Sequence, residues 1–234
     1  MKEDFDGVRP EVFGNMAKAE EKAAFEASYE DAIKQLETVS KEETPLVYAD
    51  LILQKVVALI GLEKKDEVWT EARDVLDYFI ENNEWNKAVE ACDVLYMSDQ
   101  PASIAALIHG VWLSVSFPVD PELTVMMLDH MIEETPKNAD GAALAAVTAQ
   151  YIVGVRADEK EFKNLNFLTT NLLAQVAKNH SNVDNQEQLD FWIHKLELND
   201  PAVFIPRLGM VLNAIVAESD WWFDRDVLRQ RFPQ

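Results

Sequence analysis

The stretch that decides the fold runs from residue 101 to residue 136 and reads PASIAALIHGVWLSVSFPVDPELTVMMLDHMIEETP. Its first half, Pro101–Val119, contains no Asp, Glu, Lys or Arg. The length approaches that of a membrane span, but His109, Gly110 and three serines interrupt the apolar residues, and basic flanks are missing. We therefore expect a buried core helix here and no membrane segment.

The second half of this stretch carries a strong helix start. Asp120 is a favourable capping residue, Pro121 suits the first turn, and the negative charge of Glu122 suits the positive end of a helix dipole. We expect this helix to reach about Glu134, because Pro136 cannot continue it.

Helical patterns extend in both directions from this stretch. Apolar residues recur three or four positions apart from Met16 to about Val39, and the run LVYADLILQKVVALIGL at 46–62 is apolar on nearly every face. Short links rich in turn-forming residues separate such segments, and no strand pattern is convincing. The sequence predicts an all-α fold of about ten helices, arranged as stacked αα-hairpins or as a compact irregular helical domain.

The same patterns divide the chain into three parts. Two glycines and a proline indicate an irregular N-terminal segment over 1–15. We expect a single helical domain over 16–217. The remaining residues, 218–234, form an aromatic and arginine-rich C-terminal helix or tail in this interpretation.

The spacing of two prolines adds a family resemblance. Pro101 and Pro136 lie roughly 35 residues apart, and each closes a short amphipathic helix before a helix of small, uncharged residues. Over about 70–155 this pattern resembles the tetratricopeptide repeat, which implies stacked helix pairs that bind other proteins. The residues that suit the two helices of the motif are Val75, Phe79, Ala88, Cys92 and Leu95. Trp112 and Met131 depart from it, because they replace small residues of the motif.

The charge of the chain excludes several classes of partner. Its 234 residues include 42 acidic and 21 basic side chains, which give a formal net charge of −21. Such a field repels nucleic-acid phosphates and anionic lipids, so we expect no direct nucleic-acid or membrane partner and favour a basic protein. The single cysteine fits a reducing compartment, and the N-terminal residues lack the apolar core of a secretory signal. We expect a cytoplasmic protein.

Motifs of catalysis and cofactor binding are missing from the sequence. Neither a phosphate-binding glycine loop nor a GxSxG elbow can be read in it. Cys92 lies on an apolar helical stripe, which indicates a small core residue rather than a nucleophile. We therefore expect no enzymatic activity and no cofactor.

Histidine and carboxylates come closest to forming a site in the segment DHMIEE, residues 129–134. On a helix, His130, Glu133 and Glu134 share one face, which makes them weak candidates for metal ligands, although such pairs are common surface neighbours. His109 lies in the uncharged helix, where a hydrogen-bonded core residue is the favoured interpretation. The alternative is an enzyme or small-ligand site that uses His130 or His109.

The C-terminal segment has the composition of a protein interface. It reads WWFDRDVLRQRFPQ from residue 221 and contains three of the chain's seven arginines. Trp, Phe and Arg are enriched at interfaces. The partner-binding candidates are Trp221, Trp222, Phe223, Arg225, Arg229, Arg231 and Phe232. In the competing interpretation the aromatic residues dock on the chain itself and the arginines pair with its own carboxylates.

These observations together indicate a non-enzymatic adaptor, scaffold or assembly factor, whose acidic surface binds a basic protein partner. The C-terminal segment would also suit a homo-oligomer. The alternatives are a helical enzyme or small-ligand and metal-binding protein with a site between helices, and an acidic mimic of nucleic acid.

Overall fold

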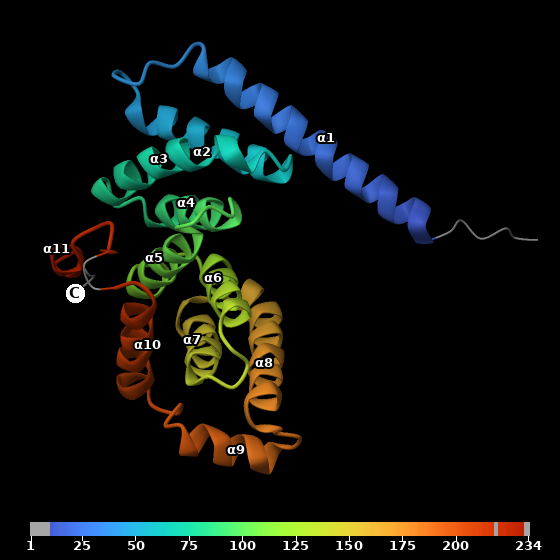
Figure 1. Cartoon of the computed structure of the whole chain (residues 1–234), viewed down its shortest axis with the longest axis vertical. Coiled ribbons are helices and arrows are strands. Elements are labelled where there is room, and N and C mark those ends of the chain that lie inside the picture. The colour runs from blue at the N-terminus through green and yellow to red at the C-terminus, as the bar shows by residue number, and fades with distance from the viewer. Residues whose placement is uncertain (1–9, 218–219, 232–234) are drawn as a thin grey trace, which may run out of the picture.

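The computed structural model describes residues 10–217 and 220–231, and over these residues the chain is helical with no strand. The all-α prediction is confirmed (Figure 1). The α-helices of the described part are α1 (Pro10–Leu36), α2 (Pro45–Gly61), α3 (Trp69–Glu81), α4 (Trp85–Met97), α5 (Ser103–Ser116), α6 (Pro121–Glu134), α7 (Asp140–Arg156), α8 (Glu159–Ser181), α9 (Gln186–Lys195), α10 (Pro201–Ile215) and α11 (Arg225–Arg229). A short 3-10 helix, η1 (Lys65–Glu67), precedes α3.

The start of α1 corrects the expectation of an irregular segment over 1–15. The helix begins at Pro10 rather than at Met16, and residues 1–9 lie outside the described part. Proline is favoured at the first helical position, since its missing N–H would have no partner there, and an internal glycine costs only about 1 kcal/mol. The C-terminal part of α1 packs on α2, whereas the rest extends beyond it with residues 18–24 exposed (Figure 1).

Short polar side chains begin many of the other helices. The Asp120 carboxylate accepts the backbone N–H of Glu122 at 2.8 Å, as its sequence context predicted. Equivalent capping bonds are made by Asp158, Asn185, Asp200 and Asp224. These local signals fix where the helices start and therefore how long the links between them are.

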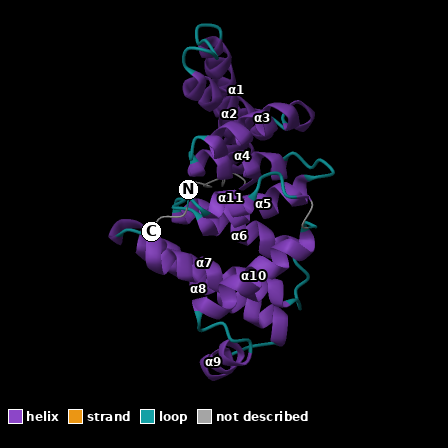
Figure 2. Cartoon of the chain, turned by 90° about the vertical axis from the view of Figure 1, so that its left-hand side faces the viewer, coloured by secondary structure: helices purple, strands orange, loops and turns teal. Residues whose placement is uncertain are grey.

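The helices pack in the order in which they occur. From α2 to α8, each helix contacts the next one along the chain, and α10 then returns to pack on α7 and α5 (Figure 2). Packing between successive helices suits the expected αα-hairpins. The correspondence to tetratricopeptide repeats stays a prediction.

The uncharged stretch forms a core helix, as expected. α5 buries residues 106–114 without interruption, including His109 and Trp112. Within the described ranges, no helix combines the length and the apolar character needed to cross a membrane. α5 therefore provides the centre on which the surrounding helices and the C-terminal residues pack.

The C-terminal end of α5 is held by one arginine from α7. Arg156 donates from Nη1 to the Ser114 carbonyl and from Nη2 to the Val115 carbonyl, both at 2.7 Å, and Nη1 also lies 3.4 Å from the Val119 carbonyl. Carbonyls at a helix C-terminus have no partner within the helix and carry the negative end of its dipole. Partial burial lowers the pKa of Arg156, but the cation is compensated by these carbonyls.

Three helices come closest together at Gly110 of α5. A Cβ atom added to Gly110 would lie 2.8 Å from the Cβ of Cys92 on α4 and 2.4 Å from Cε of Met127 on α6. Cys92 is fully buried, as predicted, and burial raises the pKa of its thiol. The thiol is therefore neutral and serves as a small packing residue at this crossing.

Candidate functional sites

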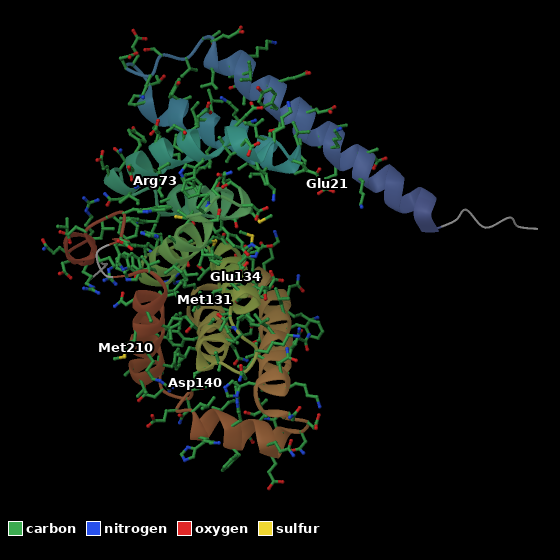
Figure 3. The ribbon with its side chains drawn as sticks, in the orientation of Figure 1. Glu21, Arg73, Met131, Glu134, Asp140 and Met210 are labelled. Carbon is green, nitrogen blue, oxygen red and sulfur yellow. The ribbon has the colours of Figure 1, made fainter. Side chains whose placement is uncertain are left out.

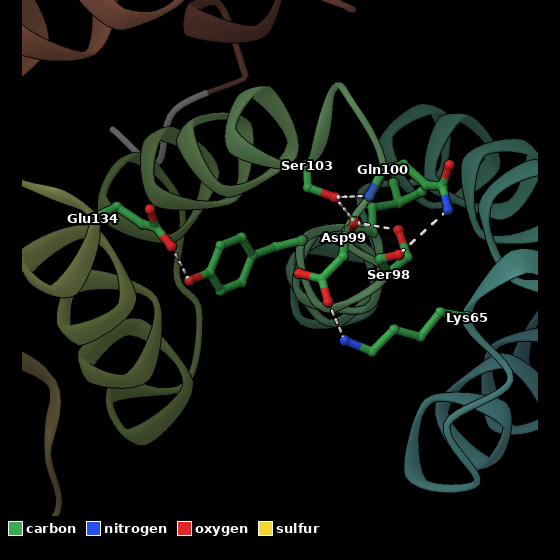
Figure 4. A network of polar contacts seen from close by, with 8 residues as sticks. Lys65, Ser98, Asp99, Gln100, Ser103 and Glu134 are labelled. Carbon is green, nitrogen blue, oxygen red and sulfur yellow. Dashed lines mark hydrogen bonds and ion pairs between the residues drawn. The ribbon is translucent and has the colours of Figure 1, made fainter.

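Of the three weak candidates for metal ligands, the structure keeps His130 and Glu133 close together and pairs Glu134 with another residue. Glu134 accepts a hydrogen bond from the hydroxyl of Tyr96 on α4 at 2.8 Å (Figure 4). His130 instead has its Nε2 3.4 Å from Asp93 Oδ1 and its Nδ1 3.7 Å from Glu133 Oε2. Among the described residues, no group of three or more His, Cys, Asp or Glu side chains is arranged to hold a metal ion. The arrangement joins α4 to α6 through charge and hydrogen bonding.

We expect this junction to make the stability of the protein depend on pH, through the charge of His130. The adjacent Asp93 carboxylate raises the pKa of His130 above its ordinary value, although partial burial opposes the shift. Because the folded-state pKa exceeds the unfolded one, the contribution is complete below about pH 6.5 and is lost as the pH rises through the folded-state pKa.

We expect His130→Gln to lower the free energy of unfolding more at pH 5.5 than at pH 8.5. The difference between the two effects should be about 1 kcal/mol or less. Urea denaturation of both proteins at the two pH values measures the difference between them. An effect of equal size at both pH values would show that the charge of His130 contributes nothing.

His109 is enclosed by aromatic side chains, and the partners of its two ring nitrogens place its proton on Nδ1. Its Nδ1 donates to the Ala105 carbonyl, and its Nε2 accepts the backbone N–H of Trp222 at 2.9 Å. Trp222 also stacks on the imidazole, with 4.3 Å between ring centroids. Burial lowers the pKa of His109 to about 4, and Arg73 and Arg225 also disfavour the charged form. A neutral imidazole that already uses both nitrogens is a structural anchor.

The aromatic residues near the C-terminus dock on this anchor. Here residues 220–231 are called the C-terminal strap. Trp221 and Phe223 lie against Trp112 of α5, with ring centroids 6.0 and 5.5 Å away. Arg225 hydrogen-bonds to Asn213 of α10 and stacks over Trp221, 4.1 Å from the ring centroid. The strap therefore packs on α5 and α10 of its own chain.

The arginines of the strap also contact the chain itself. Arg229 pairs with Asp226 one turn away, and Arg231 donates to the Ile80 carbonyl at 3.0 Å. Phe232 lies outside the described residues. A partner-binding role for the predicted set stays a prediction, but the docked aromatic residues Trp221, Trp222 and Phe223 are partly buried and already have neighbours.

A second feature, which the sequence patterns did not single out, is a groove of about 530 Å³ between α2 and α3. It is called the acidic groove here. Its apolar lining includes Leu36 at the end of α1, Ile52 and Val75, together with the rings of Tyr48 and Tyr78. The carboxylates that line it all come from α3 and are Glu71, Asp74, Asp77 and Glu81.

The carboxylates of the acidic groove are only partly neutralised. Glu71 pairs with Lys55 of α2 at 2.6 Å, and Asp77 pairs with Arg73 one turn before it. Asp74 and Glu81 are exposed and have no ion-pair partner among the described residues. The groove thus presents two carboxylates without an ion-pair partner among the described residues beside an apolar and aromatic lining, and Lys41 is a further cation in that lining.

Comparison with known proteins returns no relative: no family model, no curated protein and no solved structure matches the chain. The acidic groove and the C-terminal strap are therefore the features from which a function can be inferred.

Proposed function

We propose that this protein is a non-enzymatic adaptor that binds a basic, partly apolar segment of a protein partner in the acidic groove. The observation that carries the proposal is the combination, in one groove, of unpaired carboxylates on Asp74 and Glu81 with the rings of Tyr48 and Tyr78. The overall charge of −21 acts in the same direction, since it attracts cationic segments from a distance.

Lysine and arginine side chains suit such a surface in two ways. Their aliphatic stems can cover apolar residues such as Ile52 and Val75 while their charged ends reach the carboxylates at the edge of the groove. The tyrosine rings add cation–π attraction, and Lys41 already lies over the ring of Tyr48, 5.9 Å from its centroid. Exposed carboxylates mainly raise the association rate, so binding is expected to weaken as salt rises.

The test is a fluorescence-anisotropy titration with a labelled peptide rich in lysine and leucine, at low and at high salt. We expect the wild-type protein to bind, and the double variant Asp74→Lys/Glu81→Lys to bind at least about tenfold more weakly, because like charges then face each other. Both substituted positions are exposed, so circular dichroism and thermal melting should show an unchanged fold.

The matched control is Glu20→Lys/Glu21→Lys, which makes the same change in net charge on the exposed part of α1 (Figure 3). We expect its affinity to stay within about threefold of the wild-type value, because long-range steering by surface charge is screened by salt. Equal weakening in the two double variants would mean that net charge alone attracts the peptide. Absence of binding to the wild-type protein would refute the proposed site.

A further inference from the structure

The C-terminal strap contacts α3 near its beginning. Trp222 meets Trp69 edge to face, with 6.0 Å between ring centroids. The guanidinium of Arg73 lies over the ring of Trp222, 4.4 Å from the ring centroid. Two residues in the first turns of α3 are therefore held by one side chain of the strap.

The strap also contacts α3 at its far end. Nη1 of Arg231 lies 3.0 Å from the carbonyl of Ile80 and 3.2 Å from Oδ1 of Asn83. A cation at this position adds a second hydrogen bond to the Ile80 carbonyl, which also accepts the backbone N–H of Asn83 at 3.3 Å, and it stabilises the negative end of the helix dipole. The strap thus holds both ends of α3.

These contacts connect α3 to helices other than its main packing partners. In the fold, α3 packs mainly on α2 and α4. Besides its contacts with α3, the strap packs against His109 and Trp112 of α5 and against Asn213 of α10. It therefore ties α3 to the centre of the core.

The acidic groove lies on the other side of the same helix. Its four carboxylates and Tyr78 all belong to α3, so the position of α3 sets the width of the groove. Arg73 links the two sides directly, since it stacks on Trp222 of the strap and pairs with Asp77 of the groove. Figure 3 marks Arg73 on α3.

We infer that the C-terminal strap is a clamp that holds α3 in the position required by the acidic groove, so that strap docking and peptide binding strengthen each other. The second half of this inference rests on the proposed function, whereas the clamping of α3 does not. Coupling between two sites is reciprocal for binding free energies, so a basic peptide in the groove also protects the strap.

The first arm of the test needs no peptide. Hydrogen exchange of the α3 amides is compared between the wild-type protein and Trp222→Ala, with the amides of α6 as an internal reference. We expect α3 to exchange at least about fivefold faster in the variant while α6 stays unchanged. Arg231→Ala removes only the contact at the end of α3 and should affect the last turn of α3 alone, which provides a variant that keeps the aromatic packing. Phe167→Ala, at a side chain of α8 that is 70% exposed, is the control for loss of an aromatic residue.

The second arm measures the affinity of the lysine- and leucine-rich peptide for the same proteins. We expect Trp222→Ala and Arg231→Ala to bind about fivefold more weakly than wild type, and Phe167→Ala to bind equally well. Unchanged exchange of α3 in both strap variants overturns the clamp, whatever the peptide does. Faster exchange with unchanged affinity overturns the coupling and leaves the groove as a binding site. If the wild-type protein binds no peptide, the proposed function fails, and the exchange data alone decide whether the strap clamps α3.

Discussion

Replacing Arg156 by alanine is expected to lower the free energy of unfolding by about 3 kcal/mol, because hydrogen bonds from a charged donor are worth roughly 1.5–3 kcal/mol each and the variant loses two of them at 2.7 Å. The affected carbonyls belong to Ser114 and Val115 at the end of α5, with that of Val119 nearby. Urea denaturation followed by circular dichroism measures the change. Arg156→Lys should lose most of the same stability, since an ammonium group cannot make the forked contact.

Arg229→Ala is the control for this experiment. Arg229 is exposed, and its ion pair among the described residues is with Asp226 one turn away, so its removal should cost no more than about 0.5 kcal/mol. If Arg156→Ala were as mild as Arg229→Ala, the end of α5 would not depend on the arginine.

Gly110→Ala is expected to destabilise the protein by about 2 kcal/mol, although alanine is the better helix former by about 1 kcal/mol. The reason is the added methyl group, which would lie 2.8 Å from the Cβ of Cys92. That atom is fixed to the backbone of α4, so relief requires two helices to move apart, whereas the terminal methyl of Met127 can turn away. The measurement is again urea denaturation.

Gly209→Ala separates packing from helix propensity. Gly209 also lies inside a helix, α10, but a Cβ atom there meets nothing within 4 Å. Alanine at this position should therefore stabilise the protein by about 0.5–1 kcal/mol. Changes of the same sign at both glycines would contradict the close approach of α4, α5 and α6.

The parts of the fold that depend on local chemistry could be predicted from the sequence. A stretch without charged residues has to be buried, and α5 is; an Asp-Pro-Glu start has to open a helix, and α6 does. The prediction failed at the beginning of α1 because a proline can either stop a helix or occupy its first position, and Pro10 does the latter. Only the neighbouring structure distinguishes these outcomes.

The candidate sites show where local patterns stop being sufficient. Glu71, Asp74, Tyr78 and Glu81 recur three or four positions apart, opposite the apolar stripe of α3, and such spacing by itself indicates only a solvated polar face. Its identity as one wall of a groove depends on where α2 lies, which no local pattern states. The composition of the strap indicated an interface. The surface on which the strap docks includes His109, which is 113 residues away from Trp222 in the sequence, so no local pattern could predict it.

The strap also places a constraint on the order in which the protein can be completed. Arg231 and Ile80 are 151 positions apart, so the contact at the end of α3 cannot form until residue 231 has been synthesised. Helices that pack on their neighbours in the chain can assemble as they emerge from the ribosome, whereas contacts of such long sequence separation close late and slowly. During synthesis the contact between Arg231 and the end of α3 therefore forms later than the contacts between successive helices.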